Sequence, residues 1–286
     1  MPESPFLEIL AENLAAGVSG RRIEAIEVRQ PALLMTASPP ADSFVGEFLS
    51  LPVRRGKYLI LETESRRAIV LHLMRLGRIQ IAPPPASSRQ PPKHVSARIR
   101  FDDDSELRLV EHGTEKRARL WLAEDPDDIE ELRTIGPDPA RGEMSEAAFA
   151  TALRAESRQL KGFLTDQRAI CGIGNGLSDE ILYEARLSPL KLTRSVGDEE
   201  CSRLYRATLE VLERQIARLR ESAAGSLPQR EPSEHYTVHD HAGEKCPRCG
   251  HAIARISYAE RDTFYCPGCQ TGGSPLKDRR LSKLLK

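Results

Sequence analysis

Residues 246–269 read CPRCGHAIARISYAERDTFYCPGC, and this stretch decides the architecture of the C-terminal part of the chain. It holds two Cys-x-x-Cys pairs with sixteen residues between them. Each pair places two thiolates on one tight turn, and two such turns on a hairpin complete a tetrahedral site of four sulfur ligands. The spacing therefore predicts one structural Zn²⁺ rather than disulfides or free thiols, bound by Cys246, Cys249, Cys266 and Cys269.

A zinc module of this size depends on its metal for stability. About 50 residues cannot bury enough apolar surface to fold unaided, and four protein ligands leave no position for water, so the metal is structural. Arg261 lies between the two pairs, at the tip of the hairpin. An arginine there can contact a phosphate through two N–H groups, although a solvated turn residue is the commoner outcome.

The sequence before the zinc module has a helical pattern over residues 145–235. Ser145 is a good N-cap for the first helix. Later helices are expected over 177–186 and from Asp198 onward, the last with its apolar residues on one face. The polar stretch 223–233, rich in Gly, Ser and Pro, is expected to be a loop.

Glycines at positions 172, 174 and 176 precede the second of these helices. A glycine-rich turn lets backbone N–H groups approach an anion at a helix N-terminus. The pattern fits neither a dinucleotide fingerprint, since no strand precedes it, nor a P-loop, since no Gly-Lys-Ser/Thr follows. A phosphate site and a plain turn with Asn175 as N-cap explain the pattern equally well.

The first 129 residues are predicted to form mainly β-structure, with helical spacing only at 6–16. Short alternating or apolar runs recur at 23–28, 57–61, 68–73 and 99–101. Two proline clusters at 83–92 interrupt this region and predict a surface loop. The break at Gly136-Pro137 predicts a linker to the helical part.

The composition of the 286 residues is that of a soluble globular protein. They are 40% hydrophobic and 29% charged, and 42 basic residues balance 42 acidic ones. No stretch approaches the roughly 20 apolar residues that a membrane span needs, and the N-terminus lacks the basic and apolar regions of a secretory signal. We expect a cytoplasmic, nucleoid-associated protein of bacterial type that does not bind membranes. The residues from 274 to 286 form a basic tail.

The chain begins Met1-Pro2-Glu3. Removal of Met1 would expose the secondary amine of Pro2. An α-amino group titrates near 7.7–8.0 and a lysine near 10.4, so a terminal amine is largely available as a nucleophile at neutral pH. Glu3 could shuttle protons beside it. Met-Pro starts are common, and this feature alone is weak.

In combination, these features resemble the formamidopyrimidine-DNA glycosylase and endonuclease VIII family along nearly the whole chain. The matching segments, in chain order, are Met1–Pro5, Arg55–Leu59, Leu71–Leu73, Gly136–Pro139, Leu160–Leu164, Gly172–Asn175 and Tyr258–Gln270.

The resemblance implies an α+β fold with an N-terminal β-sandwich domain, then a helical helix–two-turn–helix domain with a C-terminal zinc-finger hairpin. The expected boundaries are 1–129 for the sandwich, 130–144 for the linker, 145–235 for the helical domain, 236–273 for the zinc finger and 274–286 for the tail.

The resemblance also implies base-excision repair by a bifunctional DNA glycosylase and AP lyase, a monomer acting on damaged double-stranded or single-stranded DNA. The base is flipped out of the stack, and oxidised bases are removed through a Schiff base at Pro2. Glu3 is the implied acid/base, Lys57 the third catalytic residue, and Glu180 a support for the amine. The implied DNA contacts are His72, Arg75, Lys116, Arg117, Lys161, Asn175 and Arg261.

Several positions depart from the family pattern. Phe6 stands where the family usually has a glutamate near the amine. Arg75 stands where the family often has a methionine, which is inserted as a wedge into the base stack. Lys116 and Arg117 occupy the second wedge loop, which has no phenylalanine. The stretch 223–233 is short, and 8-oxoguanine-specific members carry a longer loop there. These departures predict weak activity on 8-oxoguanine.

Two alternatives compete with this function. One is a family member that binds lesions or abasic sites and has lyase activity but excises bases weakly or not at all. The other is a transcription-type zinc-ribbon protein with an unrelated front half. The second gives no reason for Pro2, Lys57 and Asn175 to occur together.

Overall fold

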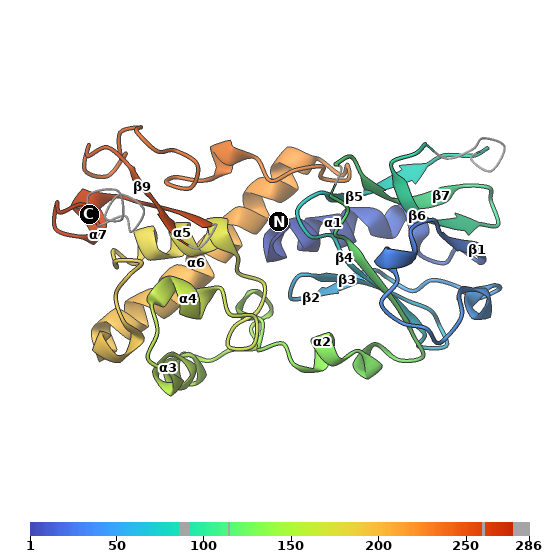
Figure 1. The fold of residues 1–286 in the computed structure, drawn as a ribbon, viewed down its shortest axis with the longest axis horizontal. Coiled ribbons are helices and arrows are strands. Elements are labelled where there is room, and N and C mark those ends of the chain that lie inside the picture. Colours follow the sequence, from blue (N-terminus) through green and yellow to red (C-terminus); the bar gives the residue numbers. More distant parts are fainter. Residues whose placement is uncertain (86–91, 114, 259–260, 277–286) are drawn as a thin grey trace, which may run out of the picture. The chain divides into compact units, whose positions relative to one another are not determined.

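The computed structural model describes residues 1–85, 92–113, 115–258 and 261–276, without the side chains of Tyr258 and Arg261. Part of the proline-rich loop, the Arg261 side chain and the tail from residue 277 therefore lie outside the described residues. The chain forms two compact units (Figure 1). Unit 1 is Met1–Thr134 with Leu219–Glu231, and unit 2 is Ile135–Arg218 with Pro232–Lys286.

Unit 1 contains two four-stranded antiparallel sheets. The first, in spatial order, is β1 (Ile23–Val28), β6 (Val95–Phe101), β7 (Glu106–Glu111) and β5 (Gly77–Ala82). The second is β2 (Val53–Arg55), β3 (Tyr58–Glu62), β4 (Ala68–His72) and β8 (Arg119–Ala123). The helical segments of this part of the chain are α1 (Ser4–Val18), η1 (Pro31–Leu33), η2 (Ala41–Phe44), η3 (Pro126–Asp128) and α2 (Glu130–Arg133).

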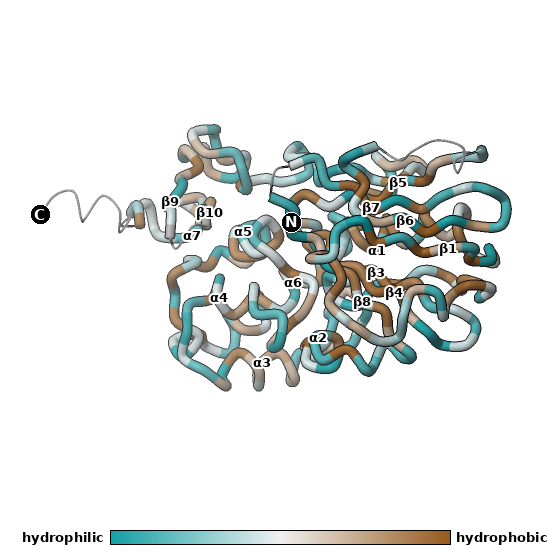
Figure 2. The backbone as a smooth tube through the Cα atoms, turned by 45° about the vertical axis from the view of Figure 1, so that its right-hand side comes forward, coloured by the Kyte–Doolittle hydropathy of each residue, from teal (hydrophilic) through white to brown (hydrophobic). Residues whose placement is uncertain are grey.

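The two sheets of unit 1 share one apolar interior. Ile69 and Leu71 of β4 and Ile79, Ile99 and Leu107 of the other sheet line the same cavity of about 10 Å³, which is too small to be a ligand site. Alternate residues along each strand face inward, because side chains on a strand point to opposite faces in turn. Figure 2 shows the hydrophobic colouring along these strands and along the buried face of α1. The arrangement is a β-sandwich.

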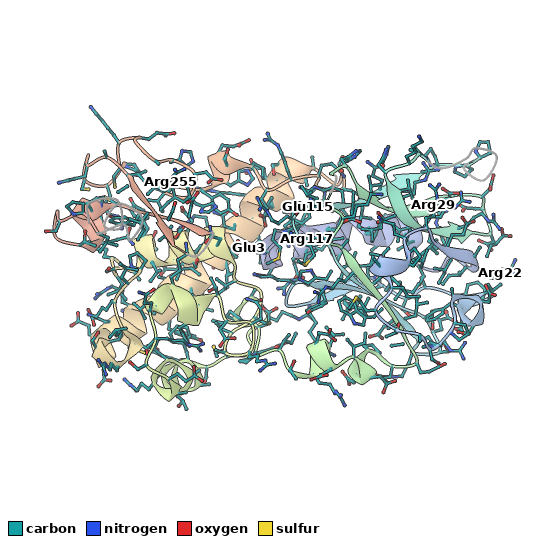
Figure 3. The ribbon with its side chains drawn as sticks, in the orientation of Figure 1. Glu3, Arg22, Arg29, Glu115, Arg117 and Arg255 are labelled. Atoms are coloured by element: carbon teal, nitrogen blue, oxygen red, sulfur yellow. The ribbon has the colours of Figure 1, made fainter. Side chains whose placement is uncertain are left out.

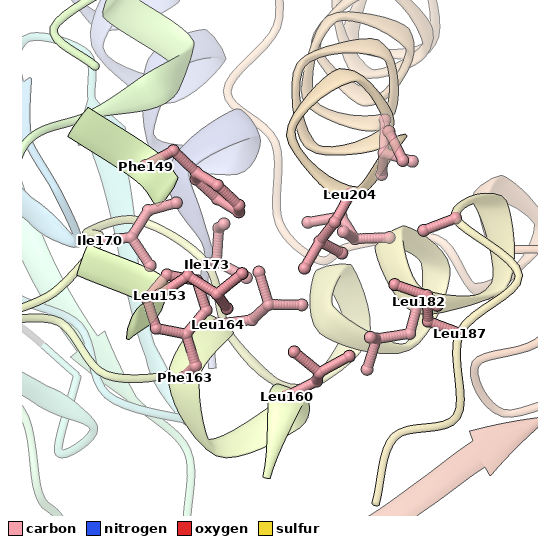
Figure 4. Close-up of a cluster of buried hydrophobic side chains, with 14 of the residues drawn as sticks. Phe149, Leu153, Leu160, Phe163, Leu164, Ile170, Ile173, Leu182, Leu187 and Leu204 are labelled. Carbon is pink, nitrogen blue, oxygen red and sulfur yellow. The ribbon is translucent and has the colours of Figure 1, made fainter. Parts of the chain in front are cut away.

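Unit 2 is helical with a short hairpin. Its elements are η4 (Pro139–Arg141), α3 (Glu146–Ala155), α4 (Leu160–Leu164), α5 (Asn175–Glu184), η5 (Thr193–Ser195), α6 (Asp198–Ala223, whose last turn from Leu219 belongs to unit 1), η6 (Ser233–His235), β9 (Ala254–Tyr258), β10 (Arg261–Tyr265) and α7 (Pro267–Gln270). Phe149 of α3 and Phe163 of α4 meet edge to face at 5.4 Å in its core (Figure 4). Such a pair adds about 1 kcal/mol beyond the area that it buries.

The predicted fold class is confirmed: a β-sandwich unit is followed by helices and a C-terminal hairpin with four cysteines. Ser145 caps α3 as expected, since its Oγ accepts from Ala148 N at 3.2 Å. One local prediction is wrong, since Lys57 lies in the turn between β2 and β3 rather than in a strand. Of the two interpretations of the glycine-rich turn, the one with Asn175 as N-cap does not match the structure, in which Asn175 is the first residue of α5 and Gly174 is the N-cap.

No helix among the described residues is both long and apolar enough to cross a membrane. This finding agrees with the absence of a long apolar stretch in the sequence.

Candidate active site and zinc centre

The N-terminal residues of unit 1 are buried just before α1. Only 4% of Glu3 is exposed, and its backbone N–H donates to Oε1 of Glu231 at 2.8 Å. Glu231 follows α6 by eight residues and belongs to the same unit. The sequence analysis did not find Glu231, because nothing in the local pattern of 223–233 distinguishes it from a solvated loop residue.

Two basic groups lie around the same point. Lys57 is buried in the β2–β3 turn, and its ammonium and the N-terminal amine, which is that of Met1 in this structure, both act on Glu231 and on His72. The N-terminus and Lys57 are therefore within electrostatic range of both His72 and Glu231 inside unit 1. The structure places the expected residues of an amine-centred site in one neighbourhood, and their chemical roles stay predictions.

His72 is neutral at physiological pH. Burial first, and then the Lys57 and Arg119 charges, lower the pKa of His72 to about 4. Its Nδ1 accepts from the backbone N–H of Met74 at 3.2 Å. The ring proton therefore lies on Nε2, and His72 offers one N–H donor rather than a positive charge.

The turn after β4 exposes Arg75 and Leu76. Leu76 is 44% exposed, and its Cδ1 packs over Gly113, where an added Cβ would lie 2.5 Å away. Arg78 closes the turn by donating to the carbonyl oxygens of Arg75 and Gly77, at 3.1 and 2.7 Å. Leu76 is thus an exposed apolar side chain beside the expected wedge residue, and the sequence analysis overlooked it.

The second expected wedge loop is fixed by a buried carboxylate. Glu111 accepts from the backbone N–H groups of Arg117 and Ala118 at 2.8 and 2.9 Å. The side chain of Arg117 is exposed and pairs with Glu115 at 2.9 Å (Figure 3). Lys116, between them in sequence, is half-buried. Glu111 therefore holds the backbone at Arg117 and Ala118, whereas the Arg117 side chain extends into solvent.

In unit 2, Asn175 and Lys161 both face the hairpin. Asn175 Nδ2 donates to the carbonyl oxygen of Asp262 at 2.9 Å, and its Oδ1 is buried without a hydrogen-bond partner among the described residues. The Lys161 ammonium pairs with Asp179 and lies 3.4 Å from the same carbonyl oxygen, with 12% of its side chain exposed. These bonds join α4, α5 and β10. A role of Lys161 in DNA contact stays a prediction, as does that of Arg261, whose side chain is not described.

Gly176, the second residue of α5, is required by the packing of this helix. A Cβ there would lie 3.1 Å from the Tyr236 ring and 3.2 Å from the His239 ring. His239 also contacts Asp179 at 2.8 Å through Nδ1. Close approach of the 236–239 segment to α5 therefore explains one of the three glycines without any anion.

The expected supporting residue, Glu180, is engaged inside unit 2. It is 1% exposed, and its two oxygens accept from the backbone N–H groups of Thr237, Val238 and His239 at 2.9, 2.7 and 3.1 Å. These bonds hold the segment that leads into the zinc module. A direct effect of Glu180 on the N-terminal amine stays a prediction.

We expect Glu180→Ala to lower the free energy of unfolding by about 3 kcal/mol, because it leaves buried N–H donors without an acceptor. Denaturant unfolding measures this loss, and Glu210→Ala, which removes an exposed carboxylate from α6, is the matched control. Unchanged stability of Glu180→Ala combined with slower chemistry at the N-terminus would instead favour the supporting role.

The four predicted zinc ligands meet at one point. All four sulfur atoms, from Cys246, Cys249, Cys266 and Cys269, lie within 4.8 Å of one another. Gly268 is required by this packing, since a Cβ there would lie 2.8 Å from the Cys249 sulfur and 2.6 Å from His251 Nδ1. Four thiolates at these separations fit a tetrahedral zinc ion, which would supply structural stability and no reaction step.

The zinc centre is anchored to α5. The Tyr183 hydroxyl lies 3.4 Å from the Cys246 sulfur, and the Arg248 guanidinium sits over the Tyr183 ring at 4.3 Å. Arg248 also pairs with Glu184 at 3.0 Å. On the other knuckle, Gln270 donates to the carbonyl oxygen of Leu187 at 2.9 Å. Loss of the metal would therefore loosen contacts with the helix that carries Asn175.

Three protein-family models match the chain. The N-terminal domain of formamidopyrimidine-DNA glycosylase matches residues 1–114, its H2TH domain matches residues 135–225, and the zinc finger found in FPG and IleRS matches residues 243–272. The matches follow the chain in the order of the β-sandwich, the helices and the cysteine hairpin.

Individual relatives cover almost the whole chain. The formamidopyrimidine-DNA glycosylase of Chloroflexus aurantiacus is 32% identical over 94% of this chain and 98% of its own length. That of Desulfitobacterium hafniense is 31% identical over 94% of this chain and its full length. Lactococcus lactis Fpg in complex with abasic-site DNA is similar in structure, with a TM-score of 0.82 and 27% identity over 94% of this chain and 99% of that one.

Proposed function

The chain belongs to the formamidopyrimidine-DNA glycosylase family of DNA-repair enzymes, and we propose that it is a bifunctional glycosylase and AP lyase that removes oxidised bases from DNA through an amine at Pro2. The observation that carries the proposal is the clustering of the N-terminus, Lys57, His72 and Glu231 in unit 1.

The chemistry proposed for this cluster needs a neutral amine and groups that move protons. Pro2 is a secondary amine once Met1 is removed. Its attack on C1′ breaks the glycosidic bond and releases the damaged base, and opening of the C1′–O4′ bond of the sugar then gives the Schiff base. Glu3 acts as the acid/base beside it, and the buried Lys57 supplies positive charge close to the reacting sugar. Elimination from the Schiff base then cuts the strand where the base was lost.

DNA contact is proposed for groups of both units. His72 offers a neutral donor, and Arg75, Lys116 and Arg117 are basic residues of the two wedge loops. In unit 2, Asn175 at the start of α5 is hydrogen-bonded to Asp262, which follows Arg261 in β10. Support for damaged DNA as the partner comes from the solved Lactococcus lactis relative, whose complex holds abasic-site DNA.

Lesion choice follows from the segments that would surround a flipped base. The 223–233 segment is tied to unit 1, where Asn13 donates to Ser226 O at 2.7 Å and Gln229 donates to Ile79 O at 3.4 Å. A short segment held in this way has little freedom to close over a purine. The wedge positions hold Arg75 and Lys116, which are flexible side chains that fill a vacated base stack less rigidly than Met and Phe.

We therefore expect excision of thymine glycol and hydantoins, in duplexes and single strands, to be at least about tenfold faster than excision of 8-oxoguanine opposite cytosine, since weakly stacked bases need less energy to flip. The measurement is the single-turnover excision rate on oligonucleotides that each carry one defined lesion. Rapid 8-oxoguanine removal, well above every other substrate, would contradict this proposal.

A matched oligonucleotide with a preformed abasic site separates the proposal from its alternative. Cleavage of that substrate together with base excision supports the bifunctional enzyme. Cleavage of the abasic site alone, with every damaged base left in place, would identify a lyase that has weak or no glycosylase activity.

A further inference from the structure

The segment Leu219–Glu231 belongs to unit 1, and we call it the strap. An ion pair and hydrogen bonds join it along its length to the rest of that unit. Its bonds, in chain order, are Arg220 to Glu12 at 2.7 Å, Asn13 to Ser226 O at 2.7 Å, Gln229 to Ile79 O at 3.4 Å and Glu3 N to Glu231 Oε1 at 2.8 Å. The strap therefore follows α1 and reaches β5. At its end, the Glu231 carboxylate accepts a hydrogen bond from the backbone N–H of Glu3.

The charged groups that face Glu231 come from three other elements of unit 1. They are the Glu3 carboxyl and the N-terminal amine before α1, Lys57 in the β2–β3 turn, and Arg78 of β5. Burial first, and then the Glu3 carboxyl, raise the pKa of Glu231 to about 7, although Lys57 and the amine act in the opposite direction. The Glu231 carboxyl therefore stays protonated to higher pH than an exposed glutamate does.

We propose that Glu231 is a positioning residue of the N-terminal site, which fixes the nucleophilic amine through the Glu3 amide and makes the reactivity of that amine depend on the ionisation of the strap carboxyl. The inference rests on the proposed amine chemistry at Pro2. Only the Cα and the carbonyl carbon of Pro2 separate its ring nitrogen from the amide that Glu231 holds, so restraint of that amide restrains the nucleophile.

The charge of Glu231 has a defined effect on the amine. An ionised carboxyl nearby stabilises the protonated amine, and so raises the pH at which the neutral nucleophile forms. A protonated carboxyl does not. Replacement by glutamine keeps an oxygen acceptor for the Glu3 amide and removes the charge, whereas replacement by alanine removes both.

The test is the rate of borohydride trapping on preformed abasic DNA, as a function of pH, for the full-length protein. We expect Glu231→Gln to move the acid limb of the profile to lower pH by about one unit. We expect Glu231→Ala to lower the trapping rate at its optimum pH about tenfold, because the amine is then no longer held in place for attack. Glu231→Gln should lower this rate less, because the glutamine oxygen can still accept from the Glu3 amide. Glu234→Gln, an exposed glutamate three residues later, should match the wild type.

Thermal unfolding gives a second readout that needs no reaction. The pKa of Glu231 is raised in the folded protein from 4.5 to about 7. The contribution of Glu231 to the free energy of unfolding is therefore present in full below pH 4.5 and is lost as the pH rises through 7. Glutamine does not titrate. The Tm of the wild type minus that of Glu231→Gln should therefore fall as the pH rises across this window.

The outcomes separate the inference from the function on which it rests. If the wild type forms an adduct at Pro2 but the pH profiles of all variants coincide, the inference on Glu231 is wrong and the proposed function stands. If the wild type forms no adduct, the proposed function fails. A Tm difference that does not change with pH would overturn the inference that Glu231 changes its charge across this window.

Discussion

Borohydride is expected to trap the protein on abasic DNA through Pro2, and an N-terminal extension is expected to abolish both the adduct and strand cleavage. The loss should be at least about a thousandfold, since removal of a covalent nucleophile leaves only binding and electrostatic assistance. Pro2→Gly should keep part of the activity, because it still presents a terminal amine. Trapping yield and mass spectrometry of the adduct measure both effects.

The control for this prediction is the other amine in the site. Lys57 is buried in the same cluster, and it could form a Schiff base if the assignment to Pro2 were mistaken. An adduct on Lys57 instead of Pro2 would overturn the proposed mechanism. The same tag at the C-terminus, which leaves the Pro2 amine unblocked, checks that the loss is not a general effect of tagging.

Removal of zinc is expected to have the second largest effect. Structural zinc contributes about 10 kcal/mol or more of apparent binding free energy in small modules, and this energy is also folding energy. Cys249→Ser should lose the metal and DNA binding together, because the hairpin that carries Arg261 and the Asp262 contact to Asn175 would no longer be held. Elemental analysis and DNA-binding titration report the two losses.

Cys201→Ser is the matched control, because Cys201 is a buried thiol in α6 that lies outside the cluster of four sulfurs. It should retain one zinc ion per chain. Pure native protein that contains no zinc, or a Cys249→Ser variant that binds DNA as tightly as the wild type, would refute this prediction.

The sequence predicted the features that depend on local spacing. Four cysteines in two pairs define a ligand set whatever surrounds them, because the coordination chemistry of zinc itself fixes the number of sulfur ligands. Ser145 is recognisable as a cap because capping involves only the next three residues. Alternating or apolar runs likewise located four of the eight strands of the sandwich, β1, β3, β4 and the end of β6, because inward and outward positions alternate along a strand.

The features that depend on distant parts of the chain could not be predicted in this way. Glu3 and Glu231 are 228 positions apart, and no periodic pattern links them. Leu76 becomes notable only because Gly113, on another strand connection, lies beneath it. Lys57 was expected in a strand because apolar residues follow it, but the two-residue turn between β2 and β3 begins one residue before it, at Gly56.

The bond between Glu3 and Glu231 also has a consequence for the order of events during synthesis. At about 5–20 residues per second, the ribosome needs roughly 10–50 s to add the 228 positions that separate the two residues. Over that interval the N-terminus has left the ribosome and the strap does not yet exist. Methionine removal can therefore precede enclosure of the new amine.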